Sequence, residues 1–195
     1  MKRKILLSFW ISCMFISLSF SQKNNMVLVE AEGFADRGGW VLDQQFMDQM
    51  GSPFLLAHGL GKPVKDASTK VTISKKGMWH VYVRTWNWCA PWKTKEKPGR
   101  FQVSVNGTIL PNELGLGDKW GWEYAGSIDI KDKENTVALK DLTGFAGRCD
   151  AILFSQNKDA DIPNEGKSMY QFRKKLLGLP EKPENGGVYD LVVVG

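Results

Sequence analysis

The sequence has little cysteine and histidine, and this scarcity argues against several kinds of site. Only three of its 195 residues are cysteine and two are histidine. His58 and His80 have no cysteine or second histidine at the spacing of zinc ligands, so no zinc site is predicted. Asp48 and His58 could join a nearby serine in a triad, but no Gly-x-Ser-x-Gly elbow accompanies them. We therefore predict no catalytic residues in this chain.

Only one long apolar run is present, and it lies at the N-terminus. Three basic residues at positions 2–4 precede the apolar residues 5–20, and Ser19-Phe20-Ser21 supplies a small-x-small cleavage site. We interpret residues 1–21 as a signal peptide cut after Ser21, which predicts a secreted or periplasmic protein. A retained membrane anchor is the alternative, but serines dilute a run that is already short for spanning a bilayer. No stable membrane anchor is therefore expected after cleavage.

An excess of positive charge is also missing once this segment is removed. The full chain has 26 Lys and Arg against 21 Asp and Glu, a net charge of +5. The N-terminal segment holds three of the basic residues and no acidic one, which leaves a net charge of +2. Nucleic-acid binding needs a concentrated basic surface, so no nucleic-acid partner is predicted.

Two cysteines, Cys89 and Cys149, remain after cleavage, which is too few for a disulfide scaffold. An oxidising compartment would allow one bridge between them. Each also lies beside a strand-like run, where a small buried hydrophobic side chain fits equally well. Because a bridge depends on geometry that the sequence does not give, both interpretations stay open.

Short alternating segments, separated by glycine and polar turns, fill residues 26–156. This pattern is typical of an all-β sandwich. In the longest segment, Trp79, Val81 and Val83 share one face, which we predict to be buried. Asn106-Gly107 is a hairpin turn signal, because both positions tolerate a positive φ. The predicted strands are 27–32, 40–43, 54–57, 70–74, 78–86, 100–105, 123–130, 136–142 and 149–155.

Residues 157–187 have a different composition, rich in Lys, Asp, Asn and Pro. Met169, Phe172 and Leu176 form the apolar stripe of a short helix predicted over 166–177, and a glycine and a proline follow it. A stretch with two prolines and paired glycines comes next. We interpret this region as a connector helix and an interdomain linker.

The final residues, 188–195, form another predicted strand, Tyr189-Asp190-Leu191-Val192-Val193-Val194-Gly195 with Val188 before it. Consecutive branched apolar residues predict a strand buried on both faces that runs into a tight turn. We interpret it as the truncated first strand of a Rossmann-type domain, with Gly195 as the first glycine of its FAD loop. A strand closing another sheet is the alternative. Without the later glycines and the helix, no cofactor is predicted to bind here.

Tryptophans gather where the predicted strands end. Aromatic rings on loops at the edge of a sandwich offer flat platforms on which sugar rings can stack. We therefore predict a glycan site, although these rings could instead cover the ends of the sandwich or dock a neighbouring domain. Arg84 and Asp43 could supply its polar contacts, with a surface ion pair as the alternative for each. The candidate glycan-binding residues are Trp86, Trp88, Trp92, Trp120, Trp122, Arg84 and Asp43.

Glu30 and Glu32 alternate with apolar residues, so both carboxylates are expected on one face of the first strand. If the last strand of the sandwich pairs nearby, Asp150 joins them, and three hard oxygen donors suit a structural Ca²⁺. A solvated edge strand that carries charges against aggregation is the alternative. Same-face positions on one strand do not straddle a scissile bond, so a catalytic pair is not predicted.

Three motifs resemble galactose-binding-like jelly rolls of the carbohydrate-binding-module type. They are Val29-Glu30-Ala31-Glu32-Gly33-Phe34, Gly38-Gly39-Trp40-Val41 and Gly77-Met78-Trp79-His80-Val81-Tyr82-Val83-Arg84. The resemblance implies a jelly-roll β-sandwich. It also implies that Glu30, Glu32 and Asp150 hold a structural calcium ion.

Other motifs resemble the N-terminal region of secreted bacterial FAD-dependent oxidoreductases. They are Asp43-Gln44-Gln45-Phe46, Gly51-Ser52-Pro53-Phe54-Leu55-Leu56-Ala57-His58-Gly59, Leu142-Thr143-Gly144-Phe145 and Gly147-Arg148-Cys149-Asp150-Ala151-Ile152. In those proteins such a module precedes a flavin domain, so the resemblance implies a downstream FAD domain as partner. FAD would belong to that domain alone, and its activity is not carried over to this chain. We predict a non-catalytic module that binds a polysaccharide or oligosaccharide, with structural docking to the flavoenzyme as the alternative.

Overall fold

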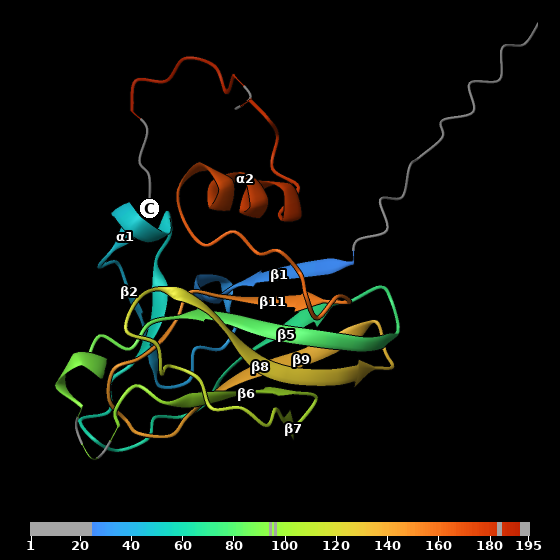
Figure 1. Cartoon of the computed structure of the whole chain (residues 1–195). Helices are drawn as coiled ribbons and strands as arrows, with labels where there is room; N and C mark the ends of the chain where they lie inside the picture. The colour runs from blue at the N-terminus through green and yellow to red at the C-terminus, as the bar shows by residue number, and fades with distance from the viewer. Residues whose placement is uncertain (1–24, 94, 96, 183–184, 192–195) are drawn as a thin grey trace, which may run out of the picture.

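The structure is a computed structural model that describes residues 25–93, 95, 97–182 and 185–191. Two β-sheets stack on each other, and a helix lies over one of them (Figure 1). The predicted signal peptide, 1–21, lies outside the described residues. Among the described residues, no helix combines the length and the hydrophobicity needed to cross a bilayer.

The strands form three antiparallel sheets, and the predicted all-β fold is confirmed. The first sheet has the order β1 (Met26–Glu30), β11 (Ala151–Ser155), β5 (Gly77–Thr85), β8 (Gly121–Ile130). The second has the order β4 (Ala67–Thr72), β9 (Glu134–Asp141), β6 (Phe101–Val105), β7 (Thr108–Ile109). The third, smaller sheet has the order β10 (Gly147–Cys149), β3 (Phe54–Ala57), β2 (Trp40–Asp43). The short helical segments are η1 (Ala31–Gly33), α1 (Met47–Met50) and η2 (Ala90–Trp92).

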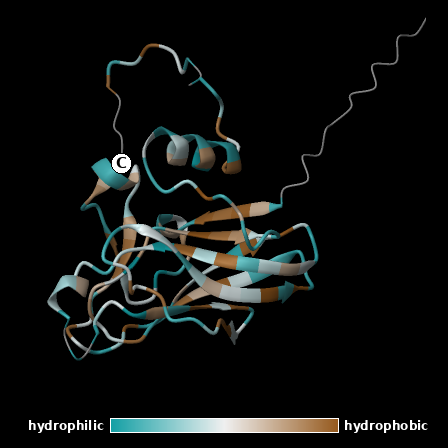
Figure 2. Cartoon of the chain, in the orientation of Figure 1, coloured by the Kyte–Doolittle hydropathy of each residue, from teal (hydrophilic) through white to brown (hydrophobic). Residues whose placement is uncertain are grey.

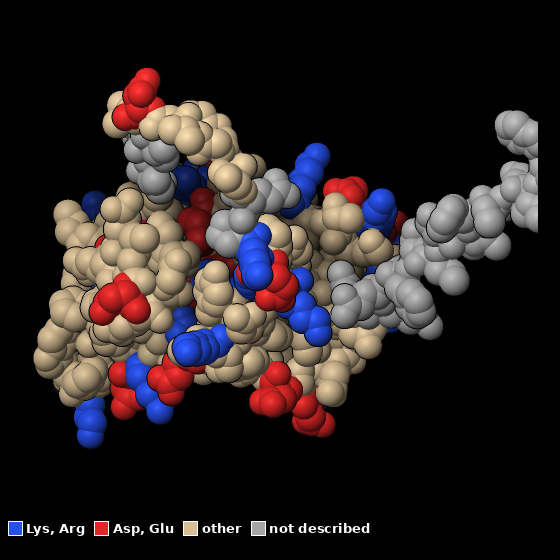
Figure 3. All heavy atoms as spheres, turned by 90° about the horizontal axis from the view of Figure 1, so that it is seen from above, with Lys and Arg blue, Asp and Glu red and all other residues tan. Residues whose placement is uncertain are grey.

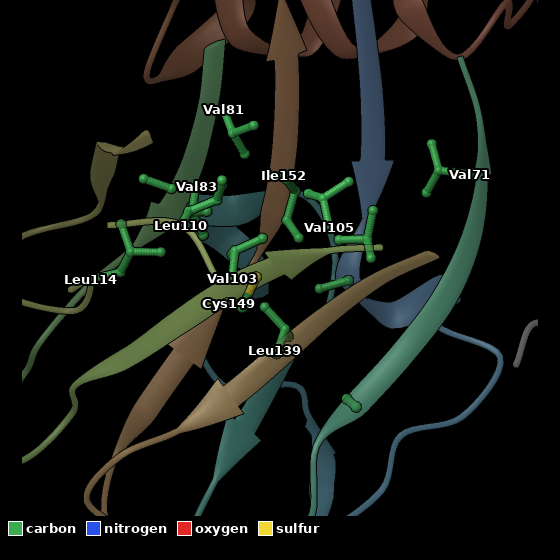
Figure 4. Close-up of a cluster of buried hydrophobic side chains, with 14 of the residues drawn as sticks. Val71, Val81, Val83, Val103, Val105, Leu110, Leu114, Leu139, Cys149 and Ile152 are labelled. Carbon is green, nitrogen blue, oxygen red and sulfur yellow. The ribbon is translucent and has the colours of Figure 1, made fainter. Parts of the chain in front are cut away.

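The core lies between the two larger sheets and follows the alternation of each strand. Trp79, Val81 and Val83 of β5 have no exposed surface, as predicted. Val103 and Val105 of β6 face them from the second sheet (Figure 4). Brown and teal residues alternate along the strands in Figure 2. Each large apolar side chain buried in this way contributes about 1.5–3 kcal/mol to the stability of the fold.

Two turns decide where the residues of interest lie. Asn106 and Gly107 have φ angles of 51° and 81° and join β6 to β7, so the predicted hairpin turn is confirmed. The first strand is shorter than predicted. It ends at Glu30, and Glu32 lies in η1 instead. The prediction that Glu30 and Glu32 share one face of a strand is therefore wrong, because the backbone turns between them.

The predicted C-terminal helix is α2 (Gly166–Leu176), and it packs against β1. Met169 of its predicted apolar stripe is buried, but the other two stripe residues are only partly so. Arg173 is also buried, with 8% of its surface exposed. The helix therefore docks on the sandwich through a charged residue as well as an apolar one.

Beyond α2, Val188–Leu191 pair with no strand in the described part of the chain. The rest of the predicted terminal strand, 192–195, including Gly195, lies outside the described residues. The strand therefore stays a prediction.

Cys89 and Cys149 are both free and buried. The structure thus favours the interpretation of both as small buried side chains, without a bridge. Burial raises the pKa of the Cys89 thiol and raises that of Cys149 well above its ordinary value.

Candidate functional site

A hollow of about 300 Å³ opens where the small third sheet meets the loops after β5 and before β10. We call it the Trp88 hollow. Its walls combine aromatic rings with the polar side chains of Asp43, Gln45 and Arg148. This mixture of flat apolar surface and a few polar groups is typical of small-ligand sites. The lining residues are Asp43, Gln45, Phe46, Leu56, His58, Trp88, Phe145, Ala146 and Arg148.

Arg148 lines the hollow, although only 5% of its surface is exposed. Its Nη1 donates to the Ala146 carbonyl at 3.0 Å, while its buried Nε has no hydrogen-bond partner. No described carboxylate forms an ion pair with it. Burial lowers the pKa of Arg148, and the nearby Cys89 and Asp43 oppose this change. An unpaired buried donor costs about 1–3 kcal/mol, so the fold holds the Arg148 side chain against the hollow at some cost in stability.

Trp88 forms one wall and continues into a more exposed aromatic surface. The guanidinium of Arg148 lies 5.4 Å from the centre of the Trp88 ring. Trp88 is 40% exposed, and Trp92 of η2 is 60% exposed. Their rings meet edge to face, with centroids 4.9 Å apart. Together they give an accessible aromatic surface at the hollow.

Asp43, at the end of β2, also lines the Trp88 hollow. Its Oδ1 accepts a hydrogen bond from the Gln45 backbone at 2.7 Å, which fixes the turn after the strand. Of the seven candidate glycan-binding residues, Asp43, Trp88 and Trp92 are therefore placed together.

Trp86 and Trp120 lie behind the hollow in a second, smaller core with Phe46 and Phe54. The Trp86 ring is 4.9 Å from Phe46 and 5.7 Å from Trp120. Trp120 is 7% exposed, and both indole Nε1 groups are buried without a partner. Trp122 donates its Nε1 hydrogen to the Pro163 carbonyl at 3.0 Å. These three side chains contribute mainly to packing and to anchoring the segment before α2.

A second hollow, of about 510 Å³, lies on the other side of this aromatic cluster. Arg84, Trp86 and Trp120 line it together with polar residues of neighbouring loops. Arg84 itself is only 2% exposed, and its guanidinium is already engaged. Its Nη1 donates to Asp150 Oδ2 at 3.0 Å and its Nη2 to the Asn164 carbonyl at 2.8 Å. Arg84 is therefore a buried structural residue in this conformation.

The three acidic residues Glu30, Glu32 and Asp150, which we call the acidic cluster, lie near α2. Arg173 of α2 donates from Nε to Glu30 Oε1 at 2.9 Å, and its Nη2 donates to Oε2 of the same carboxylate. Its Nη1 lies 3.3 Å from Asp150 Oδ2. Asp150 has no exposed surface. Its carboxylate forms ion pairs with two guanidinium groups, those of Arg84 and Arg173.

The acidic cluster does not fit a calcium ion as these residues are placed. The Arg173 guanidinium lies on Glu30 and Asp150, and a cation there would meet its positive charge. Among the residues that the structure describes, no group of three or more His, Cys, Asp or Glu side chains could hold a metal ion. Glu32 Oε2 is buried without a partner. Burial, with a smaller effect of Glu30 and Asp150, raises the pKa of Glu32 to about 7.

Charges on the surface are mixed in sign. On the face seen in Figure 3, basic and acidic residues are interspersed and do not gather by sign. Nothing on that face resembles the continuous basic surface that nucleic-acid binding requires.

Comparison with solved structures identifies the architecture. The chain superposes on a family 35 carbohydrate-binding module from Clostridium thermocellum with a TM-score of 0.53 and 15% identity. That match covers 66% of this chain and 96% of the module. The chain has the fold of a carbohydrate-binding module. No protein-family model matches the sequence, and a search of curated proteins finds no match.

The same module fold occurs in a larger enzyme. A GH26-CBM35 β-(1,4)-mannanase from Podospora anserina matches with a TM-score of 0.51 and 16% identity. The match covers 71% of this chain but only 30% of the mannanase. At these identities the comparisons show the jelly-roll β-sandwich, which confirms the predicted fold class.

Sequence reasoning missed two residues of this region, Arg148 and Arg173. Arg148 lies in β10, directly before the strand predicted over 149–155, and no local pattern distinguishes it from a surface arginine. Arg173 follows Met169 by four residues and therefore lies on the same face of the helix. That spacing could have placed Arg173 against the sandwich, although its partners lie far away in the sequence.

Proposed function

We propose that this module is non-catalytic and binds a polysaccharide or oligosaccharide at the Trp88 hollow. The observation that supports it most is a hollow lined both by the 40% exposed Trp88 ring and by Arg148, which no described carboxylate pairs. A sugar ring can stack on Trp88 and Trp92 through its C–H face. An oxygen of the same sugar can then accept a hydrogen bond from Arg148, with Asp43 available for a hydroxyl group.

A titration of the full chain with a panel of neutral and acidic polysaccharides tests this proposal. We expect at least one glycan to change the tryptophan fluorescence in a saturable way. Trp88→Ala should weaken that interaction about tenfold or more, which corresponds to the loss of about 1.4 kcal/mol of stacking energy. Tyr170→Ala is the matched control, because Tyr170 is 61% exposed and lies on α2. Failure of every glycan to bind would contradict the proposal.

A second proposal is that the module is the N-terminal part of a longer protein, an FAD-dependent oxidoreductase, and serves only to dock its flavin domain. Its support is the sequence resemblance and the terminal run from Tyr189 to Gly195, and the structural relatives add none. Sequencing the genomic DNA downstream of Gly195 decides it. A continuation into Gly-x-Gly-x-x-Gly would support it, and an unrelated continuation would contradict it.

We also propose that the protein is exported, as the N-terminal residues 1–21 suggest. N-terminal sequencing of the protein from the extracellular or periplasmic fraction should find Gln22 as the first residue. An intact Met1 in the cytoplasmic fraction would contradict export.

A further inference from the structure

We infer that Arg173 takes the place of a bound cation at the acidic cluster, so that helix α2, and not a metal ion, closes this edge of the sandwich. This inference does not depend on the proposed glycan binding.

The contacts of Arg173 are the first support. Its guanidinium donates to four different residues of the sandwich and its loops. Besides Glu30 and Asp150, the acceptors are the Met50 carbonyl at 3.0 Å and Ser52 Oγ at 2.7 Å. Carboxylate, carbonyl and hydroxyl oxygens are the ligands that Ca²⁺ prefers in proteins. The guanidinium thus satisfies a set of oxygens that a hard cation would otherwise suit.

The balance of charge is the second support. The acidic cluster brings three carboxyl groups together, and the described residues in contact with it supply two guanidinium groups, Arg84 and Arg173. Arg84 is held by Asp150 and the Asn164 carbonyl and reaches neither glutamate in an ion pair. Removal of Arg173 would leave Glu30 without a cationic partner in a partly buried position. Buried carboxylates without a partner are strongly destabilising, so a divalent cation would then be favoured.

The position of Arg173 in the chain is the third support. It comes from α2, outside the sandwich strands, and the helix contacts β1 where the cluster lies. Figure 1 shows α2 lying next to β1, the edge strand of the first sheet. The positive charge at the cluster therefore comes from a helix that lies outside the sandwich strands and packs against β1.

The test is thermal unfolding of the full chain in CaCl₂ and in EDTA, combined with Tb³⁺ luminescence as a probe of cation binding. We expect the wild-type Tm to be the same in both buffers and Tb³⁺ binding to be absent. Arg173→Gln should lower the Tm in EDTA by several degrees, bind Tb³⁺, and regain much of the lost Tm in CaCl₂. Lys175→Gln is the control, because Lys175 is exposed on the same helix and should behave as wild type.

A wild-type chain that binds Tb³⁺ at this cluster, or that loses stability in EDTA, would overturn the inference. An Arg173→Gln variant that folds but neither binds Tb³⁺ nor responds to CaCl₂ would also overturn it. If this variant folds in neither buffer, the wild-type measurements decide alone, since a calcium-independent Tm without Tb³⁺ binding supports the inference. Folding of the variant only in CaCl₂ would support it most strongly.

Discussion

Arg173 and Glu30 form a two-bond ion pair between residues 143 positions apart, with Arg173 Nε 2.9 Å from Glu30 Oε1. This pair joins the C-terminal helix to the end of the first strand. The Asp150 carboxylate accepts hydrogen bonds from both Arg173 and Arg84. The cluster therefore connects three distant parts of the chain and should matter more for stability than any surface ion pair.

Asp150→Asn tests how much this cluster contributes to the stability of the fold. The substitution leaves two buried guanidinium groups short of a carboxylate, and we expect the free energy of unfolding to fall by about 3–5 kcal/mol. Glu113→Gln is the control, because the Arg100–Glu113 pair is largely exposed and its loss should cost less than about 1 kcal/mol. Urea unfolding of both variants measures the difference. Equal losses would contradict a special role for the cluster.

Glu32 should make the stability of the fold depend on pH. Burial raises its pKa from 4.5 to about 7 in the folded chain, so between these values the folded state binds a proton that the unfolded state does not. Stability should therefore fall as the pH rises through this window. Glu32→Gln removes the free-energy cost of a buried carboxylate at pH 8. Because Glu32 is only partly buried, solvent screening reduces this cost to about 1 kcal/mol. The substitution should therefore raise the Tm at pH 8 by about 2–4 °C.

At pH 4, where Glu32 is protonated in the folded chain and largely so in the unfolded chain, the same substitution should have little effect. A Tm that falls at pH 8 would show that the Glu32 carboxylate makes a favourable interaction.

Substitutions of Trp120 in the smaller core and of Trp88 at the hollow should have different effects, because the first residue packs the fold and the second is proposed to bind the ligand. Trp120 is 7% exposed within the smaller core, so Trp120→Ala should cost about 3–5 kcal/mol of stability. Trp88 is 40% exposed, so Trp88→Ala should change stability much less. Chemical unfolding of the two variants checks this order, and the reverse order would contradict the assignment of their roles.

Cys89 and Cys149 should both be unreactive in the folded protein. Burial raises the pKa of Cys149 well above its ordinary value and also raises that of Cys89, so little thiolate is present at pH 8. We expect a maleimide to label neither thiol in the native chain and to label both in denaturant without prior reduction. Labelling that requires a reducing agent would reveal a disulfide.

The strands were predictable because their signal is local. The alternation of Trp79, Val81 and Val83 with polar residues places them in the core whatever the rest of the chain does. The turn at Ala31 was missed because Ala-Glu-Gly carries no strong signal for a 3-10 segment. Glu32 therefore lies in η1 and not on the strand face that the sequence pattern predicted.

The candidate site was less predictable because its parts meet only through the tertiary fold. Asp43 comes from the end of β2, Trp88 from the loop after β5 and Arg148 from the short strand β10, and no spacing in the sequence relates them. Likewise, α2 was predicted from its apolar stripe, yet the burial of Arg173 depends on carboxylates in β1 and beside β11. A charged residue at a helical spacing gives no indication of such distant partners.

Isothermal titration calorimetry with a polysaccharide tests the proposed function most directly, because it does not depend on tryptophan emission. The full chain, Trp88→Ala and Tyr170→Ala should each be titrated with the same glycans. We expect measurable binding by the full chain and by Tyr170→Ala, and a loss of about tenfold or more in affinity for Trp88→Ala. Equal affinities of all three proteins, or no heat with any glycan, would contradict it.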